Sequence, residues 1–392
     1  MTVRATKRGA ERTSLDGVHA DVLICGASFA GLAVARELAG SGADVLVVDR
    51  YEIGERQTSA CACPTPWLEA MGVAASIRQE LPFMTFTTPH GSVRCRLPWS
   101  WSAFDYRELC RLLWAQCGDA RFETAKVDAR AGRDRAGDVL VRTDRGTLRA
   151  PLVVDALGWR RVLARAHYQP PRAPLSRGLE VHPAHDGSGD ALDVWVERGL
   201  VRRGYGWRVP AGTEARIGVG SYDPRRHVRE ATVALAGRLG SEAVRYQGNW
   251  FPHRLRDGVQ DGVFFVGDSA GHCFPLSGEG IRTAFYFGIA CARELRGVLD
   301  GEQGREQALA AYAGFTRGHA RAFRVALSLQ RLVPALPPRV LTAALRAISV
   351  QPVADRAFGW YLDQAHPSFA LAVGRPADRR RPAAEAPLGR AA

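Results

Sequence analysis

A glycine-rich turn near the start of the chain has the spacing of a dinucleotide-binding site. It reads Gly26-Ala27-Ser28-Phe29-Ala30-Gly31, with a serine where the second glycine usually stands. The first glycine of such a turn permits a tight bend, a small third residue lets the backbone approach a pyrophosphate, and the last glycine allows close helix packing. The free N–H groups at the start of the following helix then attract the phosphates.

An acidic residue lies where a bound ribose needs one. Asp49 stands 23 residues after Gly26, at the end of an apolar stretch, and its carboxylate can accept hydrogen bonds from ribose hydroxyls. Arg50, the next residue, would contact the adenine or a phosphate. The alternative is a structural turn followed by an incidental aspartate.

The elements around this turn must place it at the edge of a parallel sheet. Residues 21–25 and 44–49 are short apolar runs typical of buried strands, and residues 30–38 have the composition of a helix. A strand, a glycine turn, a helix and a strand within about 30 residues form a βαβ unit with two parallel strands. Further buried strands are predicted at residues 151–156 and 262–266, and a helix at residues 280–295.

A second segment with chemical potential follows the last of these strands. It reads Gly267-Asp268-Ser269-Ala270-Gly271-His272-Cys273-Phe274-Pro275-Leu276-Ser277-Gly278-Glu279-Gly280-Ile281. Together with the first turn, it resembles the flavoproteins of the para-hydroxybenzoate hydroxylase-like superfamily. The resemblance implies FAD as the cofactor, with Gly267 and Asp268 at the ribityl chain and Pro275, Gly278, Gly280 and Ile281 along the flavin. A helix that begins at Gly280 would also stabilise the anion of reduced flavin.

Two further segments resemble cofactor-binding parts of this superfamily. Phe104-Asp105-Tyr106-Arg107 is similar to the start of a helix that contacts FAD, which makes Arg107 a candidate cofactor ligand. Asp155-Ala156-Leu157-Gly158 resembles the aspartate-glycine segment that aromatic hydroxylases use for FAD and NADPH, and Asp155 is the residue carried over. Its Asp-x-x-Gly form is that of the reductases, so it does not support a hydroxylase-style nicotinamide route.

One motif favours a branch of the superfamily. Tyr205-Gly206-Trp207-Arg208-Val209-Pro210 is similar to the Tyr-x-Trp-x-Phe-Pro motif of the geranylgeranyl reductase family, with valine in place of phenylalanine. Flavin halogenases carry a related Trp-x-Trp-x-Ile-Pro, but the first-position tyrosine and the lack of a lysine in this region argue against halogenation. The resemblance makes Trp207 and Pro210 candidate substrate contacts. The alternative is a pair of strand aromatics that pack a core.

Four residues are candidates for chemistry on the substrate. Cys61, in Cys61-Ala62-Cys63-Pro64, stands where the reductase family has a Cys-Gly-Gly segment beside the flavin. Tyr205 would supply a proton, and His272 would act as an acid or base because imidazole titrates near neutrality. Glu279 would contact the substrate or orient water. The alternatives are buried cysteines that pack a turn and a histidine that caps a loop.

The resemblance implies an FAD-dependent oxidoreductase that reduces carbon-carbon double bonds of a prenyl or other apolar substrate. A flavin monooxygenase, a hydroxylase or epoxidase of a natural product, is the alternative, because one fold hosts many chemistries. A non-redox flavin-dependent cyclase is the second alternative. NADPH or another external donor would supply the electrons, and no second nucleotide fingerprint marks its site.

The predicted fold class is mixed α/β. It combines a Rossmann-type FAD-binding domain, a β-sheet substrate domain and a helical C-terminal segment. We expect a flexible tail at 1–19, the FAD-binding domain at 20–82, 100–178 and 256–300, the β-rich substrate domain at 83–99 and 179–255, C-terminal helices at 301–374 and a disordered tail at 375–392.

Composition narrows the class of partner. The chain has 392 residues and a net charge of +13, yet Lys7 and Lys126 are the only lysines, and no nucleic-acid-binding pattern accompanies the arginines. The eight cysteines lack disulfide-framework or zinc spacing, so we expect reduced thiols and no metal site. No nucleic-acid partner is therefore predicted.

The sequence also predicts where the protein resides. Residues 1–17 lack the apolar segment of a secretory signal, and no apolar run is long enough to span a bilayer, so we expect a cytoplasmic protein. The helical stretch at 319–350 mixes apolar residues with arginines and would suit a lipid surface. An ordinary amphipathic helix that covers the core is the alternative.

Overall fold

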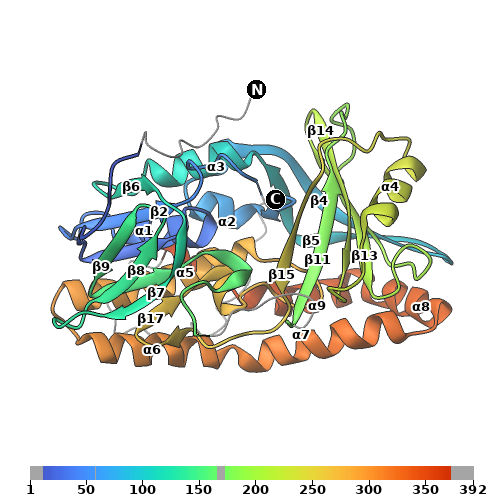
Figure 1. Cartoon of the computed structure of the whole chain (residues 1–392). Coiled ribbons are helices and arrows are strands. Elements are labelled where there is room, and N and C mark those ends of the chain that lie inside the picture. The colour runs from blue at the N-terminus through green and yellow to red at the C-terminus, as the bar shows by residue number, and fades with distance from the viewer. Residues whose placement is uncertain (1–11, 58, 166–172, 372–392) are drawn as a thin grey trace.

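The computed structural model describes residues 12–57, 59–165 and 173–371. Two large β-sheets lie side by side, and a series of C-terminal helices runs beneath both of them (Figure 1). The predicted mixed α/β class is confirmed.

The first sheet is the predicted nucleotide-binding unit. Its strand order is β16-β17-β10-β1-β2-β6, and β1 pairs in parallel with both β2 and β10. Its strands are β1 (Val22–Cys25), β2 (Val45–Asp49), β6 (Arg121–Thr124), β10 (Leu152–Asp155), β16 (Val259–Gln260) and β17 (Val263–Phe265). The helices that accompany it are α1 (Phe29–Glu37), α2 (Thr65–Ala70), α3 (Tyr106–Trp114) and α5 (Ile281–Leu299).

A close helix contact holds the two halves of this unit together. A Cβ atom on Gly288 of α5 would lie 3.0 Å from the carbonyl oxygen of Ala30, so the glycine lets α5 approach α1. Phe285 of α5 is fully buried, and its ring lies 6.0 Å from that of Phe29 and 6.2 Å from that of Trp67. Burial of these aromatic rings supplies much of the core's stabilisation.

The second sheet has eight strands in the order β15-β11-β14-β13-β12-β4-β5-β3. They are β3 (Ala62–Pro64), β4 (Ile77–Thr88), β5 (Gly91–Phe104), β11 (Leu175–Val181), β12 (Ala191–Trp195), β13 (Gly204–Ala211), β14 (Glu214–Ser221) and β15 (Gln247–Pro252). Helix α4 (Arg229–Arg238) packs on one face. The predicted β-rich segments fall within this sheet, and its strands extend beyond residues 83–99 and 179–255.

A smaller sheet is hydrogen-bonded to the start of the described chain. It consists of β7 (Val127–Arg133), β8 (Val139–Thr143) and β9 (Gly146–Ala150). Leu15 is buried and its N–H donates to the carbonyl oxygen of Arg145 at 2.7 Å, so residues 12–19 are not the flexible tail that we expected. Residues 1–11 and the predicted tail at 375–392 lie outside the described residues.

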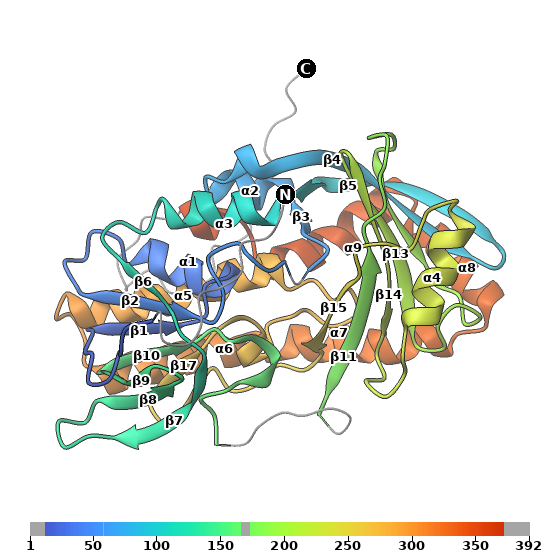
Figure 2. The same ribbon diagram turned by 45° about the horizontal axis from the view of Figure 1, so that its top comes forward.

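The C-terminal helices connect the two large sheets (Figure 2). They are α6 (Arg305–Gly318), α7 (Ala320–Leu332), α8 (Pro338–Ile348), α9 (Gln351–Asp363) and α10 (Ser368–Leu371). Trp67 of α2 donates from Nε1 to the carbonyl oxygen of Ala365 at 2.9 Å, which ties this region back to the first unit. Among the described helices, none combines the length and apolar character needed to cross a bilayer.

Candidate functional site

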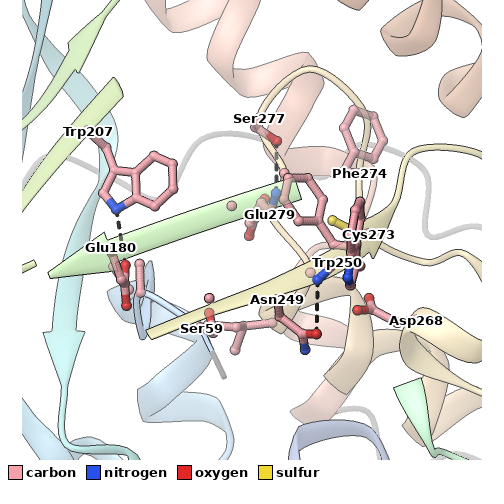
Figure 3. Close-up of a pocket in the computed structure, with 18 of the residues that line it drawn as sticks. Ser59, Glu180, Trp207, Asn249, Trp250, Asp268, Cys273, Phe274, Ser277 and Glu279 are labelled. Atoms are coloured by element: carbon pink, nitrogen blue, oxygen red, sulfur yellow. Dashed lines mark hydrogen bonds between the residues drawn. The ribbon is translucent and has the colours of Figure 1, made fainter. Parts of the chain in front are cut away.

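A cavity of about 1900 Å³ lies between the two large sheets and the C-terminal helices. Its wall includes the glycine turn before α1, the turn before α5, one face of the second sheet and parts of α7, α8 and α9. Figure 3 shows side chains of the second sheet and of the segment before α5 facing one another across it.

The glycine turn forms one end of the cavity as predicted. A Cβ atom on Gly26 would lie 2.4 Å from the carbonyl oxygen of Ala156, and one on Gly31 would lie 1.8 Å from that of Gly26. Both positions stand behind the wall, whereas residues 27–30 line it. Ser28 is the N-cap of α1 and its side chain makes no capping bond, so the helix's first N–H groups suit a bound phosphate.

Asp49 joins the end of β2 to this turn. Its Oδ2 accepts a hydrogen bond from the N–H of Ala27 at 2.8 Å, and its Oδ1 accepts one from the N–H of Tyr51 at 3.0 Å. Burial raises the pKa of this carboxyl. Each carboxylate oxygen can accept a second hydrogen bond, so the group fits ribose hydroxyls. Arg50 lines the same end of the cavity, and so does Arg107.

Asp268 supplies the clearest structural sign of an intended ligand. It lies in a 3₁₀ turn, η4 (Gly267–Ala270), and faces the cavity (Figure 3). Burial raises its pKa to about 6. Within the described residues, no hydrogen bond or ion pair reaches its carboxylate. A half-buried carboxylate without a protein partner is left for a ligand to satisfy, and the hydroxyl groups of a ribityl chain would do so.

The turn before α5 is fixed from two directions at Leu276. This residue has a φ of +74°, a left-handed conformation that costs about 1–3 kcal/mol for a residue other than glycine. Its N–H donates to Oε1 of Gln330 on α7 at 2.8 Å, and its carbonyl oxygen accepts from the hydroxyl of Tyr222 at 2.6 Å. One partner comes from the C-terminal helices and the other from the end of β14.

Ser277 is held in the same way. The hydroxyl of Tyr205 on β13 donates to its carbonyl oxygen, and its Oγ lies 2.8 Å from the hydroxyl of Tyr361 on α9. Burial raises the pKa of Tyr205, so its hydroxyl stays protonated as a donor. The predicted flavin residues Gly278, Gly280 and Ile281 follow directly and line the cavity.

Glu279 takes part in a buried ion pair. Arg282 is fully buried and donates from Nε to Oε1 and from Nη2 to Oε2, both at 2.8 Å. The hydroxyl of Tyr361 donates to Oε2 as well, and Arg282 also donates to the carbonyl oxygen of Leu362 at 2.8 Å. With its carboxylate engaged by these donors, Glu279 positions the turn and the start of α5.

Two of the three predicted catalytic residues lie behind the cavity wall. Cys61 is fully buried in the core, burial raises the pKa of its thiol, and its neighbours Ala60 and Ala62 form the wall instead. His272 is fully buried as well. Its Nδ1 accepts from the N–H of Gly267 at 3.1 Å, and its ring stacks on Phe287 at 3.7 Å. Through these contacts His272 caps the loop that begins at Gly267.

Other predicted residues also support the wall from behind. Asp155 is fully buried and accepts from Oγ of Ser269 at 2.6 Å, which joins β10 to η4. Pro210 and Pro275 do not contribute to the wall, whereas Tyr205 and Trp207 do. The rings of Tyr205 and Trp207 lie 5.8 Å apart on β13.

Three residues that sequence reasoning missed face the cavity. Cys273 lines it close to Asp268, and its position inside the second motif was the available signal. Glu180 and His182 stand at the end of β11, where no motif marks them. The eight cysteines are free thiols, and the described residues hold no cluster of side chains suited to a metal ion.

Two known proteins are similar to this chain in sequence. The chain is 32% identical to geranylgeranyl diphosphate reductase of Rhodobacter capsulatus over 143 residues, which is 35% of this chain and 36% of that protein. It is 25% identical to menaquinone reductase of Mycolicibacterium smegmatis over 87% of this chain and 91% of that protein. The chain is therefore similar to reductases of this kind. No family model matches it.

Solved structures confirm the fold of this group. A geranylgeranyl bacteriochlorophyll reductase-like protein from Thermoplasma acidophilum superimposes with a TM-score of 0.75 at 17% identity, over 90% of this chain and 98% of that one. FAD-dependent monooxygenases and a flavin-dependent brominase share the same fold. The glycine turn, Asp49 and Asp268 offer the N–H groups and carboxylates that a bound FAD would contact.

The unpaired carboxylate predicts a pH-dependent stability in the FAD-free protein. The pKa of Asp268 is higher in the folded chain than the ordinary 3.8, so folding stability falls as the pH rises from the ordinary value through about 6. We expect Asp268→Asn to raise the free energy of unfolding by about 1–3 kcal/mol at about pH 8, with little change at about pH 4. Urea denaturation at both pH values measures this, and an equal effect at both would contradict it.

Proposed function

We propose that the protein reduces carbon-carbon double bonds of a prenyl or other apolar substrate with FAD. The observation that carries this proposal is the apolar wall beyond the turn before α5. On the second sheet, this wall contains Met84, Phe86, Trp101, Leu192, Val194 and Val209. Such a wall fits a hydrocarbon chain and excludes water from the reacting groups.

The names of the relatives support the same substrate class. One is a reductase of geranylgeranyl diphosphate, which is a prenyl diphosphate, and the other is a reductase of menaquinone. Bound FAD supplies the electrons for reduction. Ser28, Asp49, Arg50, Arg107 and Asp268 would hold it, and the turn at residues 275–280 would face its flavin end.

A flavin monooxygenase is the second candidate. Its support is the shared fold, which also occurs in a p-nitrophenol 4-monooxygenase with a TM-score of 0.72. The same apolar cavity would then bind a substrate that receives an oxygen atom. The source of the electrons, NADPH or another external donor, is common to both candidates.

The two candidates differ in what oxidises the reduced protein. We expect the anaerobically reduced, FAD-loaded protein to be reoxidised by geranylgeranyl diphosphate in the absence of oxygen, with a saturated bond in the product. Absorbance of the flavin and mass spectrometry of the product measure this. No reoxidation without oxygen, together with oxygen consumption that depends on an apolar substrate, would contradict the reductase and support the monooxygenase. Turnover without net use of reductant would instead indicate the cyclase.

We further propose that α7, α8 and α9 contact a lipid bilayer. Large apolar side chains are exposed on or beside these helices, at Val325, Leu329, Leu332, Val340, Ile348, Val350, Val353 and Trp360. Leu329, Leu332 and Ile348 also line the cavity, so the exposed apolar surface continues into the apolar wall. Arginines on the same helices would favour anionic lipid headgroups. This contact would let an apolar substrate enter directly from the membrane.

Vesicle binding tests the membrane contact. We expect the protein to float with vesicles that contain phosphatidylglycerol, and a Leu332→Glu, Val350→Glu double variant to lose most of this binding because it places charges on the apolar surface. Val233→Glu, on the exposed Val233 of α4, is the control and should float like the wild type. Equal flotation of the double variant and the wild type would contradict the contact.

A further inference from the structure

A polar network lies on the cavity wall at the end of β11. Glu180 and His182 are both buried, and Nε2 of His182 lies 2.9 Å from Oε1 of Glu180. On the other side of the ring, Nδ1 lies 3.6 Å from Oε1 of Glu214 at the start of β14. The three side chains form a line, and each of them contributes to the cavity wall.

The charges around His182 are unevenly paired. Glu214 already contacts two guanidinium groups, Arg216 at 3.1 Å and Arg245 at 3.2 Å. Glu180 has His182 as its one ion-pair partner within the described residues. Because a carboxylate only accepts hydrogen bonds, a proton on each ring nitrogen satisfies both of the carboxylates that flank His182.

Two further donors fix the carboxylate of Glu180. Nε1 of Trp207 donates to Oε2 at 3.1 Å (Figure 3), and Nε2 of Gln247 donates to Oε1 at 3.0 Å. Gln247 also donates to the carbonyl oxygen of Ser59 at 3.0 Å. The carboxylate of Glu180 is therefore held by His182, Trp207 and Gln247.

The network reaches solvent at the opposite end of the sheet from the apolar helices. Glu214 follows the hairpin turn between β13 and β14, and its side chain is 21% exposed beside Arg245, which is 58% exposed. At the other end of the strands, the side chain of Arg198 donates to the carbonyl oxygens of Pro334 and Leu336 next to α7. The exposed end of the polar network and the apolar helices therefore lie at opposite ends of these strands (Figure 1).

We propose that Glu180 and His182 deliver the proton that completes reduction of the substrate, a role that rests on the proposed function. Reduction of a carbon-carbon double bond consumes two electrons and two protons. Bound FAD in its reduced form would supply both electrons and one proton. The second proton would leave Nε2 of His182 for Oε1 of Glu180 and then form the new C–H bond at the other carbon, and water that enters the cavity after the product leaves would return a proton to Nε2.

Burial explains why the proton would move toward Glu180. Transfer from His182 to Glu180 converts a buried ion pair into two neutral groups. Charged groups are costly in an environment that excludes water, so an apolar substrate that displaces water from the cavity favours the neutral pair. The substrate thereby generates the carboxylic acid that it needs, and the site holds no free acid before the substrate arrives.

The first measurement does not depend on any substrate. In the FAD-loaded protein, ¹⁵N chemical shifts of the ring nitrogens of His182 report whether both carry a proton, and a His182→Asn variant assigns the signals. We expect both nitrogens to carry a proton in the wild type, and Glu180→Gln to remove the acceptor that faces the proton on Nε2. A wild-type ring without a proton on Nε2 would overturn the proposal.

The second measurement follows the reaction itself. The pre-reduced, FAD-loaded protein is mixed with geranylgeranyl diphosphate without oxygen, and the rate of flavin reoxidation is recorded against pH. We expect Glu180→Gln to be slower than the wild type by about 100-fold or more at each pH. Its affinity for FAD should stay that of the wild type. Glu230→Gln, on the exposed Glu230 of α4, is the matched control.

The two measurements separate this proposal from the proposed function. Reoxidation of Glu180→Gln at the wild-type rate overturns the proton delivery while it supports the reductase. A wild-type protein that does not react with the prenyl diphosphate contradicts the proposed reduction. In that case the protonation state of His182 still tests, by itself, whether this side chain holds the proton that Glu180 would deliver.

Discussion

The turn at residues 275–280 depends on hydrogen bonds from parts of the chain that are far apart in sequence. Its backbone at Leu276 adopts a left-handed conformation that an isolated segment would avoid. Gln330 of α7 accepts from its N–H, and Tyr222, at the end of the second sheet, donates to its carbonyl oxygen. Tyr205 and Tyr361 hold the next residue from the same two directions. The cavity therefore has its shape only when both sheets and the C-terminal helices are packed together.

Four carboxylates of the cavity wall differ in how they are paired. Glu279 is neutralised by Arg282, and Glu180 is paired with His182, because a buried charge without a partner is costly. Among the described residues, neither Asp49 nor Asp268 has an ion-pair partner, and Asp49 accepts hydrogen bonds from two backbone N–H groups instead. We expect these two carboxylates to bind hydroxyl groups of FAD.

The sequence predicted those parts of the site that depend on local backbone conformation. The glycine turn before α1 and the position of Asp49 follow from short-range rules, because a tight bend and a strand end restrict the allowed residue types. The direction of a side chain follows no such rule, so Cys61 and His272 were expected to face the substrate and instead lie in the core. Sequence separation explains why Gln330 was missed, since its contact with Leu276 spans 54 residues and arises only from tertiary packing.

The dissociation constant of FAD in a Gln330→Met variant tests the central claim most directly. Gln330 lies behind the cavity wall, so its loss can act on FAD only through the turn at Leu276, and Ser328→Ala, on the exposed Ser328 of the same helix, is the control. The account predicts one FAD per wild-type chain, up to about tenfold weaker binding in Gln330→Met, and wild-type affinity in Ser328→Ala. Equal affinity in all three proteins, or no binding of FAD by the wild type, would contradict it.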